Sequence, residues 1–182
     1  MPTTAAPWSI RYAVLTDTAN VPRDLGNLAA DTTAGLALVA TPPSCRVALS
    51  ASTPFAVGTN PIVWTVENYD KFPAGGSKMH STSVNPERIT IRTAGQYRIS
   101  AMVLITEASG ATSTIPVYLY KNAAAIGTNW LVLPPGLSAT TTFAEEVQLA
   151  ASDYLTLKVA PSAAASVRGD LDVHMIVTWV EA

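Results

Sequence analysis

Residues 88–105 read Arg-Ile-Thr-Ile-Arg-Thr-Ala-Gly-Gln-Tyr-Arg-Ile-Ser-Ala-Met-Val-Leu-Ile. Apolar side chains occupy every second position on both sides of Gly95, from Ile89 to Ile91 and from Tyr97 to Ile105. This period of two places one face of an antiparallel strand in a core and the other face outside it. We therefore expect two strands that meet in a hairpin at Gly95, with the side chains at 97, 99, 101, 103 and 105 facing the core.

Short runs of the same kind fill the chain after residue 45. They span residues 46–49, 62–69, 88–93, 96–106, 115–121, 141–149, 154–160 and 171–180. Turn-forming Pro, Gly, Asn, Asp and Ser residues separate them, as at 73–76, 85–86 and 134–136. About eight strands at this spacing, without a long helical period, are typical of an all-β antiparallel sandwich or jelly roll.

The first 45 residues have a different sequence pattern. They are predicted to form an anchoring segment ahead of a β domain at 46–182. Residues 8–15 are expected to be an extended strand and residues 20–29 a short helix with Pro22 in its first turn. Val21, Leu25 and Leu28 fall on one stripe of that helix. Because two helical turns are not stable alone in water, this stripe should pack on another part of the chain or on a neighbouring subunit.

The composition limits the function classes. Only 13% of the residues are charged, against about 25% in ordinary proteins, which favours a surface partly buried against partners. The net charge is −2 and the 11 Lys and Arg residues are scattered, so we expect no nucleic-acid partner. No apolar run reaches the ~18 residues of a membrane span. Without a secretory signal and with one cysteine, Cys45, the chain is expected to be made in a cytoplasm and to bury that thiol.

Two of the predicted strands carry apolar side chains on both faces. Met102 and Leu104 lie on the second face of the strand at 96–106, and Tyr118 and Tyr120 on the second face of the strand at 115–121. A second apolar face is usually covered by another sheet or subunit. We therefore predict that these four residues contact neighbouring subunits, with a long covering loop as the alternative.

Residues able to carry catalysis are few, so we expect no enzyme, no cofactor and no metal. His80 is predicted in an exposed loop, and the shared face of Asp172 and His174 is explained equally well by a polar patch as by a metal pair or part of a triad. Candidate contacts to a glycan or a protein are aromatic and polar side chains in predicted loops, with edge packing as the alternative. They are Tyr69, Lys71, Phe72, Asn129 and Trp130.

Several of these segments resemble a known family in their order. Residues 86–99, 117–122 and 146–155 resemble the globular domain of complement C1q and the related tumour-necrosis-factor-like jelly rolls. Ala123 and Ser152 stand where that family usually has Gly. The resemblance covers residues 62–181 and implies a C1q/TNF-like jelly roll that forms a homotrimer.

The N-terminal residues carry a second resemblance. Residues 8–29 contain Trp-Ser-Ile-Arg-Tyr and then Asp-Thr-Ala-Asn-Val-Pro-Arg-Asp-Leu-Gly-Asn-Leu-Ala, which is similar to the opening of bacteriophage minor tail and fibre proteins. The two resemblances together imply a trimeric virion structural protein of a tail tip or fibre, assembled in the host bacterial cytoplasm. Its implied partners are other virion proteins and a host-surface glycan or protein. The alternatives are a capsid decoration or head-fibre protein, and a glycan-binding module.

Overall fold

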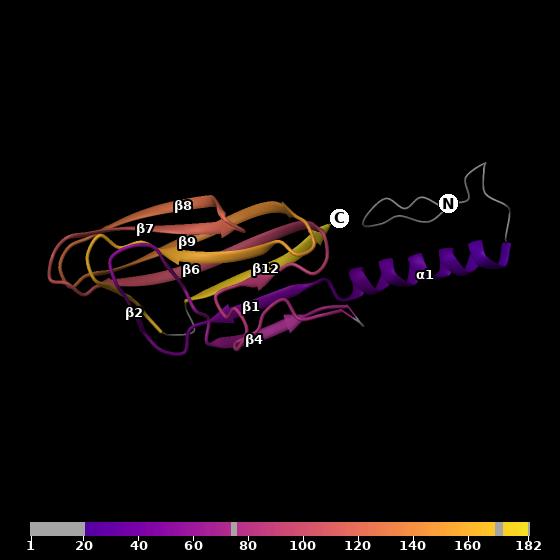
Figure 1. Cartoon of the computed structure of the whole chain (residues 1–182), viewed down its shortest axis with the longest axis horizontal. Coiled ribbons are helices and arrows are strands. Elements are labelled where there is room, and N and C mark those ends of the chain that lie inside the picture. Colours follow the sequence, from indigo (N-terminus) through magenta and orange to yellow (C-terminus); the bar gives the residue numbers. More distant parts are fainter. Residues whose placement is uncertain (1–20, 74–75, 170–172, 182) are drawn as a thin grey trace.

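The computed structural model describes residues 21–73, 76–169 and 173–181. These residues form one helix and two packed β-sheets (Figure 1). The helix is α1 (Val21–Ala40), and the strands are β1 (Ser44–Ala48), β2 (Thr53–Phe55), β3 (Asn60–Pro61), β4 (Val66–Lys71), β5 (Ile89–Thr90), β6 (Gly95–Glu107), β7 (Ser113–Lys121), β8 (Ala124–Leu133), β9 (Ser138–Leu149), β10 (Tyr154–Val159), β11 (Ala165–Val167) and β12 (His174–Glu181).

The strands divide into a seven-stranded and a five-stranded sheet. The larger sheet has the order β2-β11-β6-β12-β1-β4, with β9 also paired to β6. The smaller sheet has the order β3-β10-β7-β8, with β5 also paired to β10. Neighbouring strands pair antiparallel throughout the described residues. This arrangement confirms the predicted all-β sandwich.

The core lies between the inward faces of the two sheets. Tyr97, Ile99, Ala101, Val103 and Ile105 of β6 are all buried, as the alternation predicts. Leu119 of β7 and Leu157 of β10 supply buried side chains from the other sheet. Cys45 of β1 is also buried in this core, as expected. The hydrophobic effect therefore fixes which face of each strand points inward.

The predicted hairpin at Gly95 is wrong. Ile89 and Thr90 of β5 pair with β10 in the smaller sheet, whereas β6 starts at Gly95 and pairs with β9 and β12 in the larger sheet. The chain at residues 91–95 therefore crosses from one sheet to the other instead of returning beside itself. The alternation identified both strands and their buried faces. A pattern within one strand does not indicate which other strand pairs with it.

Gly95 is required at this crossing by the backbone and by the space around it. Its φ is +152°, a conformation that side chains rarely allow. A Cβ atom there would lie 2.3 Å from Trp179 Nε1 and 2.4 Å from the Glu181 carbonyl oxygen. The indole N–H of Trp179 also donates to the Ala94 carbonyl oxygen at 3.4 Å. The end of β12 thus packs directly on the crossing.

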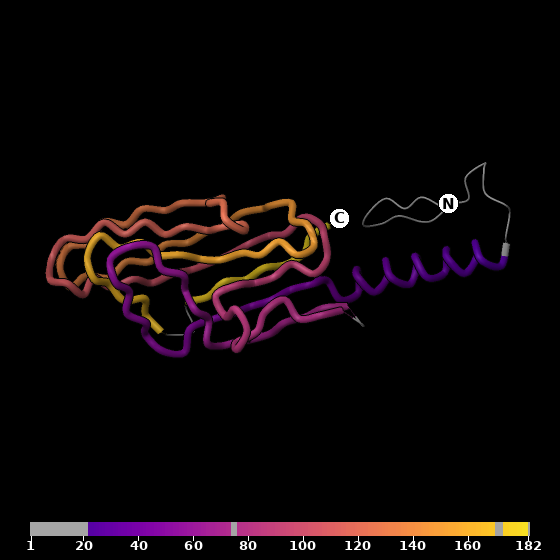
Figure 2. The backbone as a smooth tube through the Cα atoms, viewed as in Figure 1, coloured from indigo at the N-terminus to yellow at the C-terminus, as the bar shows by residue number. Residues whose placement is uncertain are grey.

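The helix is longer than predicted. It continues past residue 29 to Ala40 and ends just before the Pro42-Pro43 pair. Figure 2 shows it running outward from one end of the sandwich and leading straight into β1. Leu38 is the only buried side chain among the described side chains of α1. No helix in the described residues is both long enough and apolar enough to span a membrane.

The N-terminal boundaries can be placed only in part. The extended strand predicted at 8–15 lies outside the described residues, and so does the side chain of Val21. Ser44 and Cys45 already belong to β1 and pair with β12 and β4. Strand β1 therefore begins two residues before the first predicted strand at 46–49, and the division into an anchoring segment and a β domain stays a prediction.

Four strands were not indicated by the alternation. β2, β3 and β11 are two or three residues long, and Gly127 and Asn129 interrupt the apolar alternation in the sequence of β8. The turn from β7 to β8 contains Asn122 with φ +54°, and Ser152 has φ +77° in the turn before β10. Asn tolerates this left-handed region better than most residues, whereas Ser152 is held there with its N–H donating to the Ile91 carbonyl oxygen at 2.9 Å.

A methyl group at position 95 should destabilise the fold. We expect Gly95→Ala to lower the free energy of unfolding by roughly 2–4 kcal/mol, from overpacking against Trp179 and from backbone strain. Urea unfolding monitored by fluorescence at matched protein concentration measures this loss. The control is Gly26→Ala, since no atom lies within 4 Å of that Cβ position in α1. An equal loss in both variants would contradict the packing argument.

Glu107 joins two loops at the end of β6. Its carboxylate accepts hydrogen bonds from the Ser109 hydroxyl and from the N–H groups of Ser109, Gly110 and Gly136. These contacts, first the Ser109 hydroxyl and then the Gly136 N–H, lower the pKa of Glu107 to about 2. The carboxylate therefore holds the loop after β6 against the loop before β9.

Glu107 should make the fold sensitive to acid. Its folded-state pKa of about 2 lies below its ordinary value of 4.5, so the unfolded chain takes up this proton first. The stabilisation is complete above pH 4.5 and disappears as the pH falls toward 2. We expect the stability difference between the native chain and Glu107→Gln to shrink over that interval in thermal melts. A difference that stays constant with pH would show that the charge of Glu107 does not stabilise the loops.

Candidate functional site

A pocket lies between β4 and the loop at residues 77–88. It has a volume of about 490 Å³, and its lining includes Glu67 of β4 and the basic side chains Lys78, Arg88 and Arg92. Cavities of this size are common at small-molecule sites. Because Glu67 and the loop come from distant parts of the sequence, the fold creates this pocket rather than any local motif.

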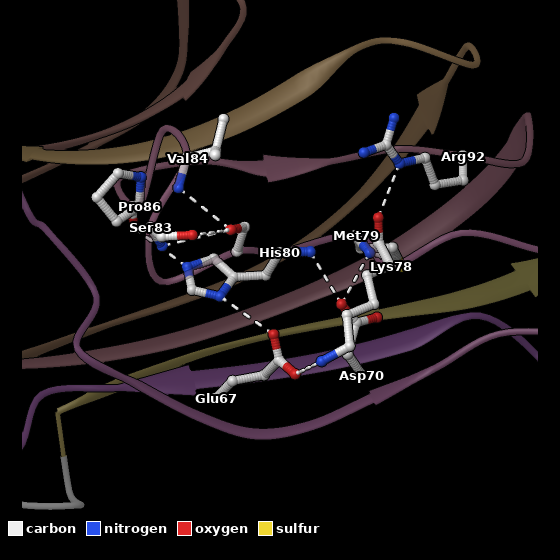
Figure 3. Close-up of polar contacts among 10 residues, drawn as sticks. Glu67, Asp70, Lys78, Met79, His80, Ser83, Val84, Pro86 and Arg92 are labelled. Carbon is white, nitrogen blue, oxygen red and sulfur yellow. Dashed lines mark hydrogen bonds and ion pairs between the residues drawn. The ribbon is translucent and has the colours of Figure 1, made fainter.

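Glu67 lies at the centre of the polar contacts on one side of the pocket (Figure 3). One of its carboxylate oxygens pairs with the Lys78 ammonium group. The other lies 3.6 Å from His80 Nδ1. The hydrogen bond to Glu67 is the main cause that raises the pKa of Lys78. The negative charge of Glu67 is therefore largely engaged by groups inside the site.

His80 is buried, which corrects the prediction of an exposed loop histidine. Its residue exposure is only 3%, and its Nε2–H donates to the Pro86 carbonyl oxygen at 3.1 Å. Since a carbonyl oxygen can only accept, Nε2 carries a proton. The sequence around His80 is polar and rich in turn residues. Nothing in it indicates that the imidazole ring donates a hydrogen bond to the carbonyl oxygen of the residue six positions later.

Asp70 of β4 fixes the start of the loop. Its Oδ2 accepts the backbone N–H groups of Met79 at 2.8 Å and His80 at 2.9 Å. Burial is the largest influence on the pKa of Asp70 and raises it, while these two hydrogen bonds act in the opposite direction. Residue 79 is further tied to β5, because its carbonyl oxygen accepts from the Thr90 N–H at 2.7 Å. The pocket wall is thus preformed.

Several residues that the sequence offered for catalysis or metal binding can be placed in the structure. Within residues 21–73, 76–169 and 173–181, no group of three His, Cys, Asp or Glu side chains is arranged to hold a metal ion. Burial, followed by the charge of Asp70, raises the pKa of the Cys45 thiol and disfavours a reactive thiolate. Asp172 lies outside the described residues, and His174 pairs in register with Met102 and Ala48. The prediction that the protein is not an enzyme stays a prediction.

The five predicted contact residues are divided between two sheets. Tyr69 and Lys71 lie on β4, where the Lys71 ammonium is 5.4 Å from the centre of the Tyr69 ring, and Phe72 follows the strand. Asn129 and Trp130 lie on β8 and not in a loop. The Asn129 side-chain amide donates to the Thr142 carbonyl oxygen at 2.7 Å and so links β8 to β9. These residues do not form one site.

The four predicted intersubunit residues are also divided. Met102 and Leu104 are on the outer face of the larger sheet, since their neighbours at 101, 103 and 105 point into the core. Tyr118 and Tyr120 are on the outer face of the smaller sheet, where their rings meet edge to face at 6.0 Å. Trp130 joins them there with 65% of its surface exposed. The two pairs thus point in opposite directions.

The predicted anchoring stripe on α1 is exposed and longer than expected. Leu25 is 61%, Leu28 40%, Leu36 65% and Val39 64% exposed. Together with Thr32, these residues follow one face of the helix at spacings of 3, 4, 4 and 3 residues. We call the five residues the α1 stripe. The domain to which α1 is attached does not cover it.

Comparisons with known proteins identify the fold. No protein-family profile and no curated protein sequence matches the chain. Solved structures do match: Eiger TNF from S. frugiperda is 12% identical with a TM-score of 0.51, covering 76% of this chain and 93% of that chain. The globular domain of zebrafish complement 1qA is 10% identical with a TM-score of 0.52, covering 76% and 97%.

Murine APRIL is similar to the same degree, at 11% identity and a TM-score of 0.52, covering 76% of this chain and 98% of that chain. Identities this low are informative about the fold alone. They confirm the predicted C1q/TNF-like jelly roll. The resemblance of the N-terminal residues to bacteriophage tail proteins stays a prediction, and the pocket at Glu67 and His80 was not anticipated from the sequence.

Proposed function

We propose that this protein is a homotrimeric structural component of a bacteriophage particle, at a tail tip or fibre. The observation that carries the assembly is the α1 stripe, which is mostly apolar and is not covered by any other described part of the chain. The C1q/TNF-like jelly roll is consistent with a compact, rigid assembly unit.

The α1 stripe needs a partner. A helix of 20 residues that contains two Gly and two Thr is marginal alone in water, and most helix stability in proteins comes from packing an apolar face. The stripe carries no charge, so copies of it can face one another without repulsion. Thr32 is compatible with such a contact, because its hydroxyl already donates to the Leu28 carbonyl oxygen at 2.8 Å. Further copies of the same helix are therefore suitable occupants.

The outer face of the larger sheet would extend the contact between copies that begins at α1. Only residues 41–43 separate α1 from β1, and the Trp179 N–H donates to the Pro43 carbonyl oxygen at 2.8 Å, which holds the junction against β12. The outer face beside β12 carries Met102, Leu104 and Ile176, and the ion pair of Arg98 and Glu146 lies further along the same face. Copies joined through α1 would thus bring this face of the larger sheet together.

The smaller sheet would then face outward. Around a threefold axis each copy presents one side to the axis, so two outer faces that point in opposite directions cannot both lie there. We assign Met102 and Leu104 to the trimer contact. Tyr118 and Tyr120, together with Trp130 and Val132, are left on the outside for other virion proteins or for the host surface.

The particle assignment rests on the resemblance of residues 8–29 to phage minor tail and fibre proteins, and on the low content of charged residues. A virion location, with assembly in the host bacterial cytoplasm, follows from it as part of the proposal. Immunogold labelling of particles tests it directly: labelled tails support it, labelled heads favour a capsid decoration or head-fibre protein, and unlabelled particles contradict it.

Charges placed on the α1 stripe should reduce the oligomer. We expect the native chain to show the mass of a trimer of 19.1 kDa chains in light scattering at micromolar concentration. The double variant Leu28→Asp/Leu36→Asp should show a lower mass, since buried carboxylates disfavour a helix bundle. The matched control is Ala30→Asp/Ala34→Asp on the opposite helix face, which should keep the full mass. A native chain that is monomeric would contradict the assembly proposal.

A second pair of variants separates the two sheet faces. Met102→Asp/Leu104→Asp should give folded particles of lower mass, and near-ultraviolet circular dichroism checks that the core is intact. Tyr118→Asp/Trp130→Asp, on the other sheet, should leave the mass unchanged. If the tyrosine and tryptophan changes dissociate the oligomer and the methionine and leucine changes do not, the contact lies on the smaller sheet.

A further inference from the structure

The pocket beside Glu67 contains polar groups that the fold itself does not use. Ser77, Thr82 and Thr90 are among the residues that line the cavity, and none of their hydroxyls makes a hydrogen bond to another residue in the described parts of the chain. Hydroxyls that take part in the fold behave differently: the neighbouring Ser81 Oγ accepts from the N–H groups of Ser83 and Val84. The pocket thus offers three free donor and acceptor groups inside one preformed wall.

Arg92 differs from the other cations of the pocket. Lys78 pairs with Glu67, and Arg88 pairs with Glu87 at 3.0 Å and stacks on the Tyr154 ring at 4.3 Å. Arg92 forms no ion pair and no ring contact with any described residue. Its one hydrogen bond runs from Nε to the Lys78 carbonyl oxygen at 2.8 Å.

That single bond orients the Arg92 guanidinium group. In Figure 3 the Nε atom faces the Lys78 carbonyl oxygen, and the two terminal nitrogens point away from it. These terminal N–H groups form the fork that binds carboxylate or phosphate oxygens in a bidentate manner. Because Nε is already held, less rotational freedom is lost when an anion binds.

The charge balance of the lining favours an anion. Glu67 is the only carboxylate among the described lining residues, and it is engaged by Lys78 and faces His80. The lining also contains Arg88 and Arg92, so its formal charge is positive. A cavity of about 490 Å³ is larger than a bare inorganic ion requires, and the free hydroxyls suit a ligand that carries hydroxyls of its own.

We propose that this pocket binds an acidic sugar unit, with its carboxylate or phosphate on the Arg92 guanidinium and its hydroxyls on Thr82, Thr90 and Ser77. The proposal does not depend on trimer formation, since none of these residues belongs to the α1 stripe or to the outer face at Met102 and Leu104. The variants below should therefore keep the mass of the native oligomer in light scattering, so that a failure here is distinct from a failure of the assembly.

Titration of the full chain with small probes tests the proposal. Isothermal calorimetry or saturation-transfer NMR is run with glucuronate, glucose 6-phosphate, glucose and inorganic phosphate. We expect glucuronate, glucose 6-phosphate or both to bind at least about tenfold more tightly than glucose, because a charged hydrogen bond is lost with the neutral sugar. Binding of only one acidic sugar identifies the anionic group and supports the proposal.

Two outcomes of the titration would overturn it. Inorganic phosphate that binds as tightly as both acidic sugars would show an adventitious ion only, with no role for the hydroxyls. Failure of both acidic sugars to bind at millimolar concentration would show that the free groups do not form a sugar site.

Substitutions locate the binding. Arg92→Gln should weaken the acidic sugar at least about tenfold, whereas the control Arg23→Gln, in α1 and paired with Asp24, should leave the affinity unchanged. If Arg92→Gln also lowers the melting temperature, Thr82→Val is the second variant, and a fewfold loss of affinity is expected for it. Unchanged affinity in Thr82→Val and Arg92→Gln together would contradict the assigned site.

Discussion

Packing between the inward faces of the two sheets positions every other feature of the molecule. Ile99 and Val103 of β6 meet this interior from one sheet, and Leu119 and Leu157 meet it from the other. Once these side chains are inside, the period of two directs their neighbours outward, so Met102 and Tyr118 are placed on opposite surfaces. The loop at residues 77–88 is held against these sheets by the hydrogen bonds from Met79 and His80 to Asp70.

The larger elements of this frame could be predicted from the sequence. The alternation at residues 96–106 identified β6 and its buried face, because burial of one face is a local property of a strand. The pairing of β5 with β10 could not be predicted, since it depends on residues some 65 positions away. Strand β8 was missed for the same reason: its pairing to β7 stabilises it despite Gly127, which weakens the local pattern.

The candidate sites differed in the same way: local patterns could be predicted from the sequence, and contacts between distant residues could not. The stripe at Leu25 and Leu28 could be predicted because helical periodicity is a local property of the sequence. Its continuation to Leu36 and Val39 extends the same helix face. The pocket could not be predicted, because β4 and a separate loop form it together. The contacts between them, such as that of Asp70 with His80, join residues that carry no periodic pattern. Polar networks of this kind depend on tertiary placement, and single-sequence patterns do not report them.

The two proposals therefore assign separate tasks to separate surfaces. The α1 stripe and the part of the larger sheet's outer face around Met102 and Leu104 suit permanent burial against further copies of the chain. The pocket at Arg92 has free polar groups and suits a soluble ligand. An assembly of this design would hold several identical pockets in fixed positions, and simultaneous binding to a repetitive surface would strengthen weak individual contacts.

The central claim is that α1 is stable because its stripe is buried in an assembly of identical chains. Hydrogen–deuterium exchange of the full chain at micromolar concentration tests it most directly, with the amides of β6 as an internal reference. The account predicts that the α1 amides are protected together with those of β6 and lose that protection on dilution. Free exchange of α1 at every concentration, beside a fully protected β6, would contradict it.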